Sequence, residues 1–240
     1  MPSKNAVKLY IENSYYHIYN RGVDKREIFT DKKDYTVFLG LLRRYLVPPE
    51  NENKLDSKNG IINKNTIKSK VGPRNDIKRP RYRTDLYNKI QLISYCLMPN
   101  HFHLMIKQST KEAIIDIMRA LSNSYVIYFN KKYERTGPLF SGKYKAVLVE
   151  GESYLLHLTR YIHLNPIDLG YTRSDLVSYP YSSYADYLGK RNTEWLNPKE
   201  ILSFFRSVQK KDLRDMLSYQ SFVEDYLEDS KEMLLELTID

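Results

Sequence analysis

The stretch Gln91–Gln108, QLISYCLMPNHFHLMIKQ, contains two apolar runs separated by a Pro-Asn pair. Apolar runs on either side of turn-forming residues are typical of a β-hairpin. We therefore predict strands at Lys89–Met98 and His101–Lys107, joined by a short connection. Two histidines, His101 and His103, lie in the second run with one apolar residue between them.

Side chains alternate along a strand, so His101 and His103 are predicted to point to one face, and Phe102 and Leu104 to the core on the other. Same-face neighbours lie roughly 7 Å apart at Cα, given a rise of about 3.4 Å per residue. That spacing lets two imidazoles bind one cation, at roughly 2.0–2.1 Å each if it is zinc-like. A structural role on a half-solvated face is the alternative, so the pair needs further ligands to predict a metal site.

The hydrophobic pattern around the hairpin predicts an α+β protein. Apolar residues spaced by three and four indicate helices, and short β-branched and aromatic runs indicate strands. The order favours a sandwich in which a mostly antiparallel sheet carries its helices on one face. The predicted elements are a strand at Tyr15–Asn20, a helix at Asp31–Leu46, the hairpin, a helix from a Ser109–Glu112 capping box to about Tyr133, a strand at Lys143–Val149 and a helix at Glu152–Asn165.

Two further segments depart from this pattern. Residues 50–85 are rich in Lys, Asn and Asp without periodicity, which predicts a mobile insertion. Ten basic and two acidic residues lie between Lys54 and Arg83. The insertion is therefore either a solvated loop or an arm that contacts phosphates. We predict one domain at residues 1–190. Residues 191–240 have amphipathic spacing and more acidic residues, so we predict that they form a helical C-terminal extension.

Composition bounds the class of protein. Hydrophobic residues make up 42% and charged residues 28% of the 240 residues, which is ordinary for a globular protein. No apolar run approaches the 18 residues of a spanning helix, and the first 20 residues lack the apolar core of a secretory signal. The lone Cys96 is expected to be a small buried residue in a reducing compartment. A net charge of +9 favours an anionic partner, nucleic acid first.

The helix at Glu152–Asn165 offers the side chains that the histidine pair lacks. Tyr161 and Asn165 are four residues apart and share one flank, with His157 one turn earlier. A phenol has a pKa near 10, and a divalent ion bound by the neighbouring amide oxygen would favour the phenolate and polarise a phosphodiester. This predicts covalent phosphotyrosine chemistry. Packing is the alternative for Tyr161, and the following Pro166 predicts an irregular last turn.

Five motifs together resemble the REP-associated tyrosine transposases, the stand-alone relatives of the single-tyrosine HUH transposases of insertion sequences. The HFH and YIHLNP segments in this order are specific to the family, whereas either segment alone would not be. The resemblance runs from about Tyr15 to Leu188 and is interrupted by the insertion. The motifs are YHIYNRG at 16–22, SYCLMPNHFHLMI at 94–106, PLFSGKYKA at 138–146, YLLHLTRYIHLNPIDLGY at 154–171 and YPYSSY at 179–184.

This resemblance implies a ferredoxin-like fold with the histidine pair on a central strand. It also implies Mg²⁺- or Mn²⁺-dependent cleavage of single-stranded DNA, often beside a hairpin, by a tyrosine that leaves a 5′-phosphotyrosine and a free 3′-OH. Reversal of that step joins strands. Position by position, His101 and His103 match the HUH pair, Tyr161 matches the nucleophile, and Asn165 matches the polar residue, Asn or Gln in relatives, that completes the metal site.

The basic residues Arg21, Arg135, Lys143, Lys145 and Arg160 are candidate DNA contacts, although each could equally be a solvated surface charge. We expect single-stranded or hairpin DNA as the partner, no membrane contact, and a monomer or homodimer in the cytoplasm, associated with the nucleoid. Three functions stay open: a transposase, a domesticated hairpin-binding module without turnover, and a metal-dependent hydrolase without a covalent intermediate. The insertion and the extension depart from the family pattern and leave the recognised DNA sequence open.

Overall fold

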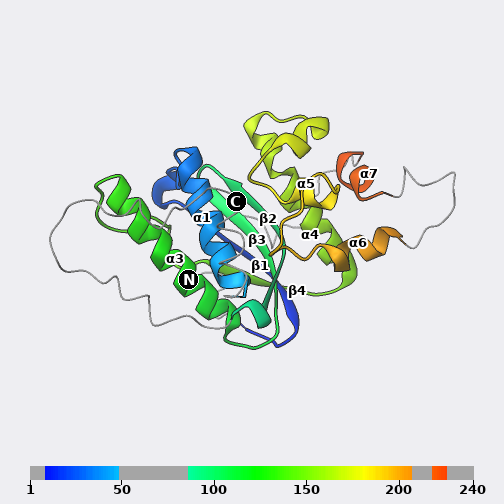
Figure 1. Cartoon of the computed structure of the whole chain (residues 1–240), viewed down its shortest axis with the longest axis horizontal. Coiled ribbons are helices and arrows are strands. Elements are labelled where there is room, and N and C mark those ends of the chain that lie inside the picture. The colour runs from blue at the N-terminus through cyan, green and yellow to red at the C-terminus, as the bar shows by residue number, and fades with distance from the viewer. Residues whose placement is uncertain (1–8, 49–85, 207–217, 226–240) are drawn as a thin grey trace, which may run out of the picture.

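The computed structural model describes residues 9–48, 86–206 and 218–225. Its centre is a four-stranded sheet in the order β2-β3-β1-β4, with every neighbouring pair antiparallel (Figure 1). The chain order βαββαβ with this sheet order is the predicted ferredoxin-like arrangement, so the α+β class is confirmed. The elements are β1 (Ser14–Arg21), α1 (Lys32–Leu46), β2 (Ile90–Met98), β3 (His101–Gln108), α3 (Ala113–Lys132) and β4 (Lys145–Val149).

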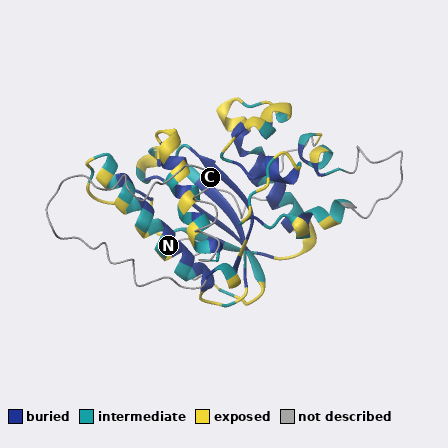
Figure 2. Cartoon of the chain, viewed as in Figure 1, coloured by how far each residue is buried: buried dark blue, intermediate teal, exposed yellow. Residues whose placement is uncertain are grey.

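Helices cover both faces of the sheet, whereas we expected them on one face (Figure 1). α1 and α3 pack on the face of Phe102, whose ring centroid lies 5.2 Å from that of Phe38. The next helix, α4 (Glu152–Leu164), lies on the other face, where the Thr159 hydroxyl donates to the sulfur of Met105. Helices cover both faces because β2 and β3 are buried on both sides, as the dark strands in Figure 2 show. Strands that are apolar on both sides need cover on both sides.

The start of α3 also differs from its prediction. The capping box at Ser109–Glu112 does not form, and α3 begins at Ala113 without a cap from its own N-cap side chain. Gln108 replaces it, because its side-chain oxygen accepts from the Ile114 N–H at 3.2 Å. The Ser109 hydroxyl instead donates to the carbonyl of Lys89 at 3.3 Å, which closes the open end of the hairpin.

The segments after α4 pack around that helix. His163 of α4 is fully buried and bonds the hydroxyls of Tyr219 and Ser183, each at 2.7 Å. These contacts hold the C-terminal elements against α4. The elements are η3 (Asn165–Leu169), η4 (Arg173–Ser178), α5 (Tyr184–Tyr187), α6 (Lys199–Arg206) and α7 (Tyr219–Glu224). Two short 3₁₀ helices lie earlier in the chain: η1 (Val23–Lys25) follows β1, and η2 (Leu86–Asn88) precedes β2.

Several predictions fall on residues outside the described ranges. They include the mobile insertion at 50–85 and the parts of the helical extension at 207–217 and 226–240. Within the described ranges, every helix is too short or too polar to cross a membrane.

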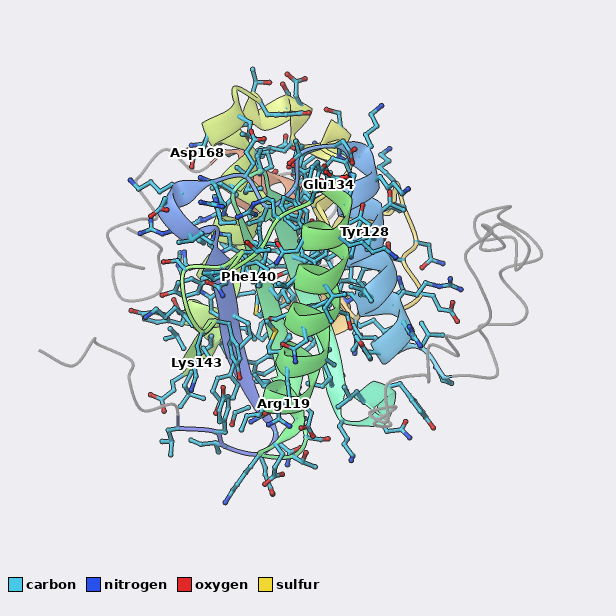
Figure 3. All side chains as sticks on the ribbon, turned by 90° about the vertical axis from the view of Figure 1, so that its left-hand side faces the viewer. Arg119, Tyr128, Glu134, Phe140, Lys143 and Asp168 are labelled. Atoms are coloured by element: carbon cyan, nitrogen blue, oxygen red, sulfur yellow. The ribbon has the colours of Figure 1, made fainter. Side chains whose placement is uncertain are left out.

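An open hollow of about 700 Å³ lies beside α3, between that helix and the loop at residues 138–142. Figure 3 shows α3 from the side, with Phe140 beside it. The Phe140 ring packs on Phe102, with 5.9 Å between centroids. Because Phe102 points away from the two histidines of β3, the hollow lies on the opposite face from them.

Candidate active site

His101 and His103 occupy one face of β3, on the side of α4. Phe102 and Leu104 project to the opposite face and are 1% and 0% exposed. The two imidazole rings lie 5.0 Å apart between centroids and are nearly perpendicular, at 88°. His103 is fully buried and His101 is partly exposed, so solvent or a ligand can reach the pair from the His101 side.

Both ring nitrogens of His101 face amide oxygens. Nδ1 lies 2.6 Å from Oδ1 of Asn100, and Nε2 lies 3.3 Å from Oδ1 of Asn165. The amide nitrogens set these orientations, because that of Asn100 donates to the Lys25 carbonyl at 3.3 Å and that of Asn165 donates to the Tyr161 carbonyl at 2.8 Å. Both amides therefore present acceptors to the imidazole.

A neutral His101 cannot donate to both oxygens. Burial lowers the pKa of His101, although the bond to Asn165 opposes that shift, so the ring carries a single proton at neutral pH. With the proton on Nδ1, in the shorter bond to Asn100, the Nε2 lone pair faces the lone pairs of Asn165. Two acceptors in this position repel unless a cation or a proton lies between them. The pair is thus suited to hold a shared cation.

His103 adds a third lone pair. Its Nδ1 lies 2.8 Å from Nε2 of His17, whereas its own Nε2 is buried and has no hydrogen-bond partner among the described residues. Burial, followed by the neighbouring His101 and His17 rings, holds the pKa of His103 well below its usual value. The ring is therefore neutral, and a buried polar nitrogen without a hydrogen-bond partner costs free energy that a bound ligand would offset.

The donor set fits a hard divalent cation with open positions. In the described part of the chain, no three His, Cys, Asp or Glu side chains are grouped to hold a metal. The candidate set instead comprises two imidazole nitrogens and one amide oxygen. Neutral ligands on one side leave the remaining positions to water and phosphate oxygens, which Mg²⁺ and Mn²⁺ prefer. The residues therefore fit the predicted ions.

Tyr161 lies directly beside these ligands. Its half-buried ring meets that of His103 edge to face, with 5.4 Å between centroids and 87° between planes. Tyr161 and Asn165 lie one helical turn apart, and the 2.8 Å bond from the Asn165 amide to the Tyr161 carbonyl joins them. A candidate nucleophile and three candidate ligands thus come from two elements, β3 and the end of α4, within one chain.

The last turn of α4 changes to a 3₁₀ helix at Asn165, but the backbone there stays helical. Asn165 has helical angles, φ −48° and ψ −38°, although Pro166 follows it. The chain passes at this point into the 3₁₀ helix η3, with the proline in its first turn. A first-turn residue has no N–H partner within a helix, so the missing proline donor costs little there.

Arg160 contradicts its prediction as a DNA contact. It is 1% exposed, and its guanidinium carbon lies 4.6 Å from the centre of the Phe222 ring. Its Nη2 lies 2.5 Å from Nδ1 of His157, so His157 is also directed away from the candidate metal ligands. Helix α7, which carries Phe222, covers this flank of α4, and the extension had not been expected to do so.

Arg21 and Lys145 lie on the face of the histidines. Arg21 pairs with His101 across the sheet. Lys145 pairs with Tyr19, which in turn pairs with His103. Directly opposed residues of antiparallel strands project to the same face. A phosphate bound at the candidate site would therefore lie near both cations.

The other two candidate DNA contacts are less close to the site. Lys143 is exposed in the loop that precedes β4 (Figure 3). Arg135 follows α3 on the opposite face, where its guanidinium carbon lies 5.7 Å from the centre of the Phe129 ring.

Sequence reasoning missed His17 and Asn100, which bond the two histidines of the pair. Asn100 was interpreted only as a turn residue. His17 had a usable signal, because it is a polar residue inside the strand YYHIYN and shares a face with Tyr15 and Tyr19.

The chain is similar to known proteins over part of its length. The family described as "Transposase IS200 like" matches residues 69–165. The fold is similar to a solved structure of a REP-associated tyrosine transposase bound to a REP hairpin, with 10% identity, 80% of this chain and 96% of that chain covered, and a TM-score of 0.46. A crystal structure of a Deinococcus radiodurans R1 protein has 14% identity, covers 68% and 95%, and gives a TM-score of 0.33. No curated protein matches the chain.

Proposed function

We propose that the chain cleaves and rejoins single-stranded DNA with Tyr161 as the nucleophile, a function supported by the match of residues 69–165 to the IS200-like transposase family. One observation carries the proposal. Nε2 of His101 lies 3.3 Å from Oδ1 of Asn165, and Nε2 of His103 is buried without a hydrogen-bond partner among the described residues, while the ring of Tyr161 packs on that of His103. A metal-assisted attack on a phosphodiester uses this combination of groups.

The proposed reaction conserves the number of phosphoester bonds. The phenolic oxygen of Tyr161 attacks the phosphorus, forming a phosphotyrosine on the 5′ side and breaking the bond to the 3′ oxygen. That oxygen leaves with a proton as a free 3′-OH, and the phenol proton passes to solvent. For joining, a 3′-OH attacks the phosphotyrosine and releases the tyrosine. No external energy source is needed, because each step exchanges one ester for another.

Mg²⁺ or Mn²⁺ bound by His101, His103 and Asn165 would polarise the scissile phosphate and favour the phenolate. Arg21 and Lys145, on the same face, are proposed to hold the flanking phosphates, and exposed Lys143 to extend this contact. All four site residues come from one chain, so a second copy is not required for chemistry. We propose hairpin or single-stranded DNA as the substrate, because the family acts on such DNA.

Tyr161→Phe tests the assignment with a single strand that contains a hairpin and carries a radioactive or fluorescent label at its 3′ end, on the fragment that stays bound to the tyrosine. Wild-type protein with Mn²⁺ is expected to form a covalent adduct that survives denaturing electrophoresis, and the variant none, while binding stays within about twofold. Tyr154→Phe is the matched control, because Tyr154 lies on the same helix and is 39% exposed. An adduct formed by Tyr161→Phe would show that another residue is the nucleophile.

The alternatives give different products. A domesticated hairpin-binding module would bind the hairpin tightly without Mn²⁺ and form neither adduct nor cleaved strand. A metal-dependent hydrolase would release two strands with no protein attached. The edge-to-face contact of Tyr161 with His103 favours the covalent reaction over direct hydrolysis by water.

A further inference from the structure

We propose that His17 is a positioning residue, which fixes the proton of His103 on Nδ1 and thereby keeps Nε2 open for the cation. This inference rests on the proposed metal site. His17 is fully buried on β1, opposite Met105 in the sheet register, and its side chain lies on the histidine face. Its ring is nearly parallel to that of His103, at 16°, and its Nε2 approaches Nδ1 of His103 to 2.8 Å.

Only one proton can lie between these two nitrogens. In the first arrangement, Nδ1 of His103 donates to Nε2 of His17, and the Nε2 of His103 is a lone pair. In the second, Nε2 of His17 donates, so a neutral His103 must carry its proton on Nε2, where a metal would otherwise bind. A histidine ligand requires an unprotonated nitrogen. The cation therefore selects the first arrangement, and His17 supplies the acceptor on which it depends.

A histidine at position 17 would be unfavourable if its role were only structural, because burial of an imidazole costs free energy. The strand neighbours of His17 are Tyr16 and Ile18, at 1% and 0% exposure, and an apolar side chain would avoid the desolvation of a second buried imidazole. Metal-bound histidines commonly donate their other N–H to a carboxylate or a backbone carbonyl. In this chain a neutral imidazole takes that place, so it orients His103 without adding negative charge next to the cation.

The test compares His17→Gln with His17→Leu. The glutamine side-chain oxygen can accept from Nδ1 of His103, whereas leucine removes the acceptor and keeps the volume apolar. Mn²⁺ affinity is measured by the loss of the free-ion EPR signal, without DNA. We expect the dissociation constant to rise at least about tenfold for His17→Leu, in line with other partners of metal ligands, and to stay within about threefold for His17→Gln. His163→Gln, a buried histidine outside the site, is the control.

A second measurement on the wild-type protein keeps the test independent of variant folding. Long-range ¹H–¹⁵N spectra distinguish the two tautomers of each of the five histidines. His103 is expected with its proton on Nδ1 before Mn²⁺ is added. A proton on Nε2 in the apo protein, or unchanged Mn²⁺ affinity in a folded His17→Leu, would overturn the proposal. If the wild type did not bind Mn²⁺, the proposed metal site would be wrong. The tautomer measurement would still show whether His17 fixes the proton of His103 on Nδ1.

Discussion

At the scale of single residues, the decisive unit is a nitrogen and an oxygen that both accept hydrogen bonds. His101 Nε2 and Asn165 Oδ1 lie 3.3 Å apart, and neither has a proton to share when the imidazole is neutral and carries its proton on Nδ1. A cation turns this repulsion into two favourable contacts. Asn165 therefore has two separable roles, because its oxygen faces the site while its nitrogen bonds the carbonyl of Tyr161.

Asn165→Ala removes both groups, and comparison with a control that loses only a bond to a backbone carbonyl isolates the role of the oxygen. Removal of the oxygen is expected to raise the Mn²⁺ dissociation constant at least about tenfold, a lower limit taken from residues that only support metal ligands. Asn130→Ala is the control, because Asn130 makes a comparable bond to a backbone carbonyl, that of Gly137, far from the histidines. Equal Mn²⁺ affinity in Asn165→Ala and the wild type would leave Asn165 as a helix-capping residue alone.

His163 predicts a pH dependence of stability. Burial lowers its pKa to about 3, whereas an unfolded histidine titrates near 6.5. Below about pH 6.5 the unfolded chain binds a proton that the folded chain does not, so the free energy of unfolding falls as pH drops toward 3. Between pH 7 and pH 5 this loss is about 2 kcal/mol, from about 1.4 kcal/mol per pH unit.

Urea denaturation of the wild type and of His163→Gln at pH 7 and pH 5 measures this loss. The glutamine does not titrate, and the contributions of His101 and His103 are common to both proteins. The difference between the two proteins should therefore change by about 2 kcal/mol between the two pH values. Parallel pH profiles would show that His163 titrates as it does in the unfolded chain.

Residue-level prediction from sequence succeeded where one element determines geometry. Strand alternation placed His101 and His103 together, and helical spacing placed Tyr161 beside Asn165. It missed His17, because the bond to His103 depends on the register between β1 and β3, which lie 86 residues apart. It misjudged Arg160, because the cover over that side chain comes from α7, some 60 residues downstream.

At the scale of elements, the connection between β2 and β3 is held by the segment that follows β1. The Gly22 N–H donates to the Asn100 carbonyl at 2.8 Å, and the Ile28 N–H donates to the Pro99 carbonyl at 2.7 Å. Asn100 in turn bonds the ring of His101. The segment after β1 thus fixes the turn, and through Asn100 it helps to orient His101, a candidate metal ligand.

Gly22→Ala should disturb this connection. A Cβ there would overlap the carbonyl oxygen of Arg26 and lie 3.0 Å from Cγ2 of Ile28. We expect a loss of about 1–3 kcal/mol in the free energy of unfolding, as for other overpacked positions, and weaker Mn²⁺ binding because Asn100 is displaced. Gly40→Ala is the control, because a Cβ on this exposed position of α1 has no atom within 4 Å.

Gly40→Ala should stabilise the protein by about 0.5–1 kcal/mol, since glycine weakens a helix interior. Urea midpoints of the two variants should therefore move in opposite directions. If Gly22→Ala were as stable as the wild type and bound Mn²⁺ with unchanged affinity, the segment after β1 would have to shift to accommodate the Cβ without displacing Asn100.

At the scale of the whole molecule, local sequence patterns predicted the order of elements and the antiparallel sheet. They did not predict which face each helix covers. That choice depends on burial on both sides of β3, where Met105 and Ile106 point to opposite faces and are both fully buried. The unbroken apolar run after His103 was the available sign, since a strand with one solvated face alternates instead.

The asymmetry of the two faces leads to a prediction about DNA binding. Arg21 and Lys145 lie on the histidine face, and Lys33 lies on α1, which packs on the other face. Each phosphate contact on a single strand contributes about 0.7 to the slope of log K against log salt. Arg21→Ala and Lys145→Ala should each reduce that slope by about this amount, because each removes one contact. Lys33→Ala should leave the slope unchanged.

Fluorescence anisotropy with a labelled single strand, between about 50 and 200 mM salt, measures the slopes. The measurement is made in the Tyr161→Phe protein, so that covalent capture does not distort the equilibrium. Basic residues outside the described ranges contribute equally to every variant and cancel in the comparison. An equal decrease in the slope for Lys33→Ala would mean that DNA binding depends only on net charge. The prediction that DNA binds on the histidine face would then be wrong.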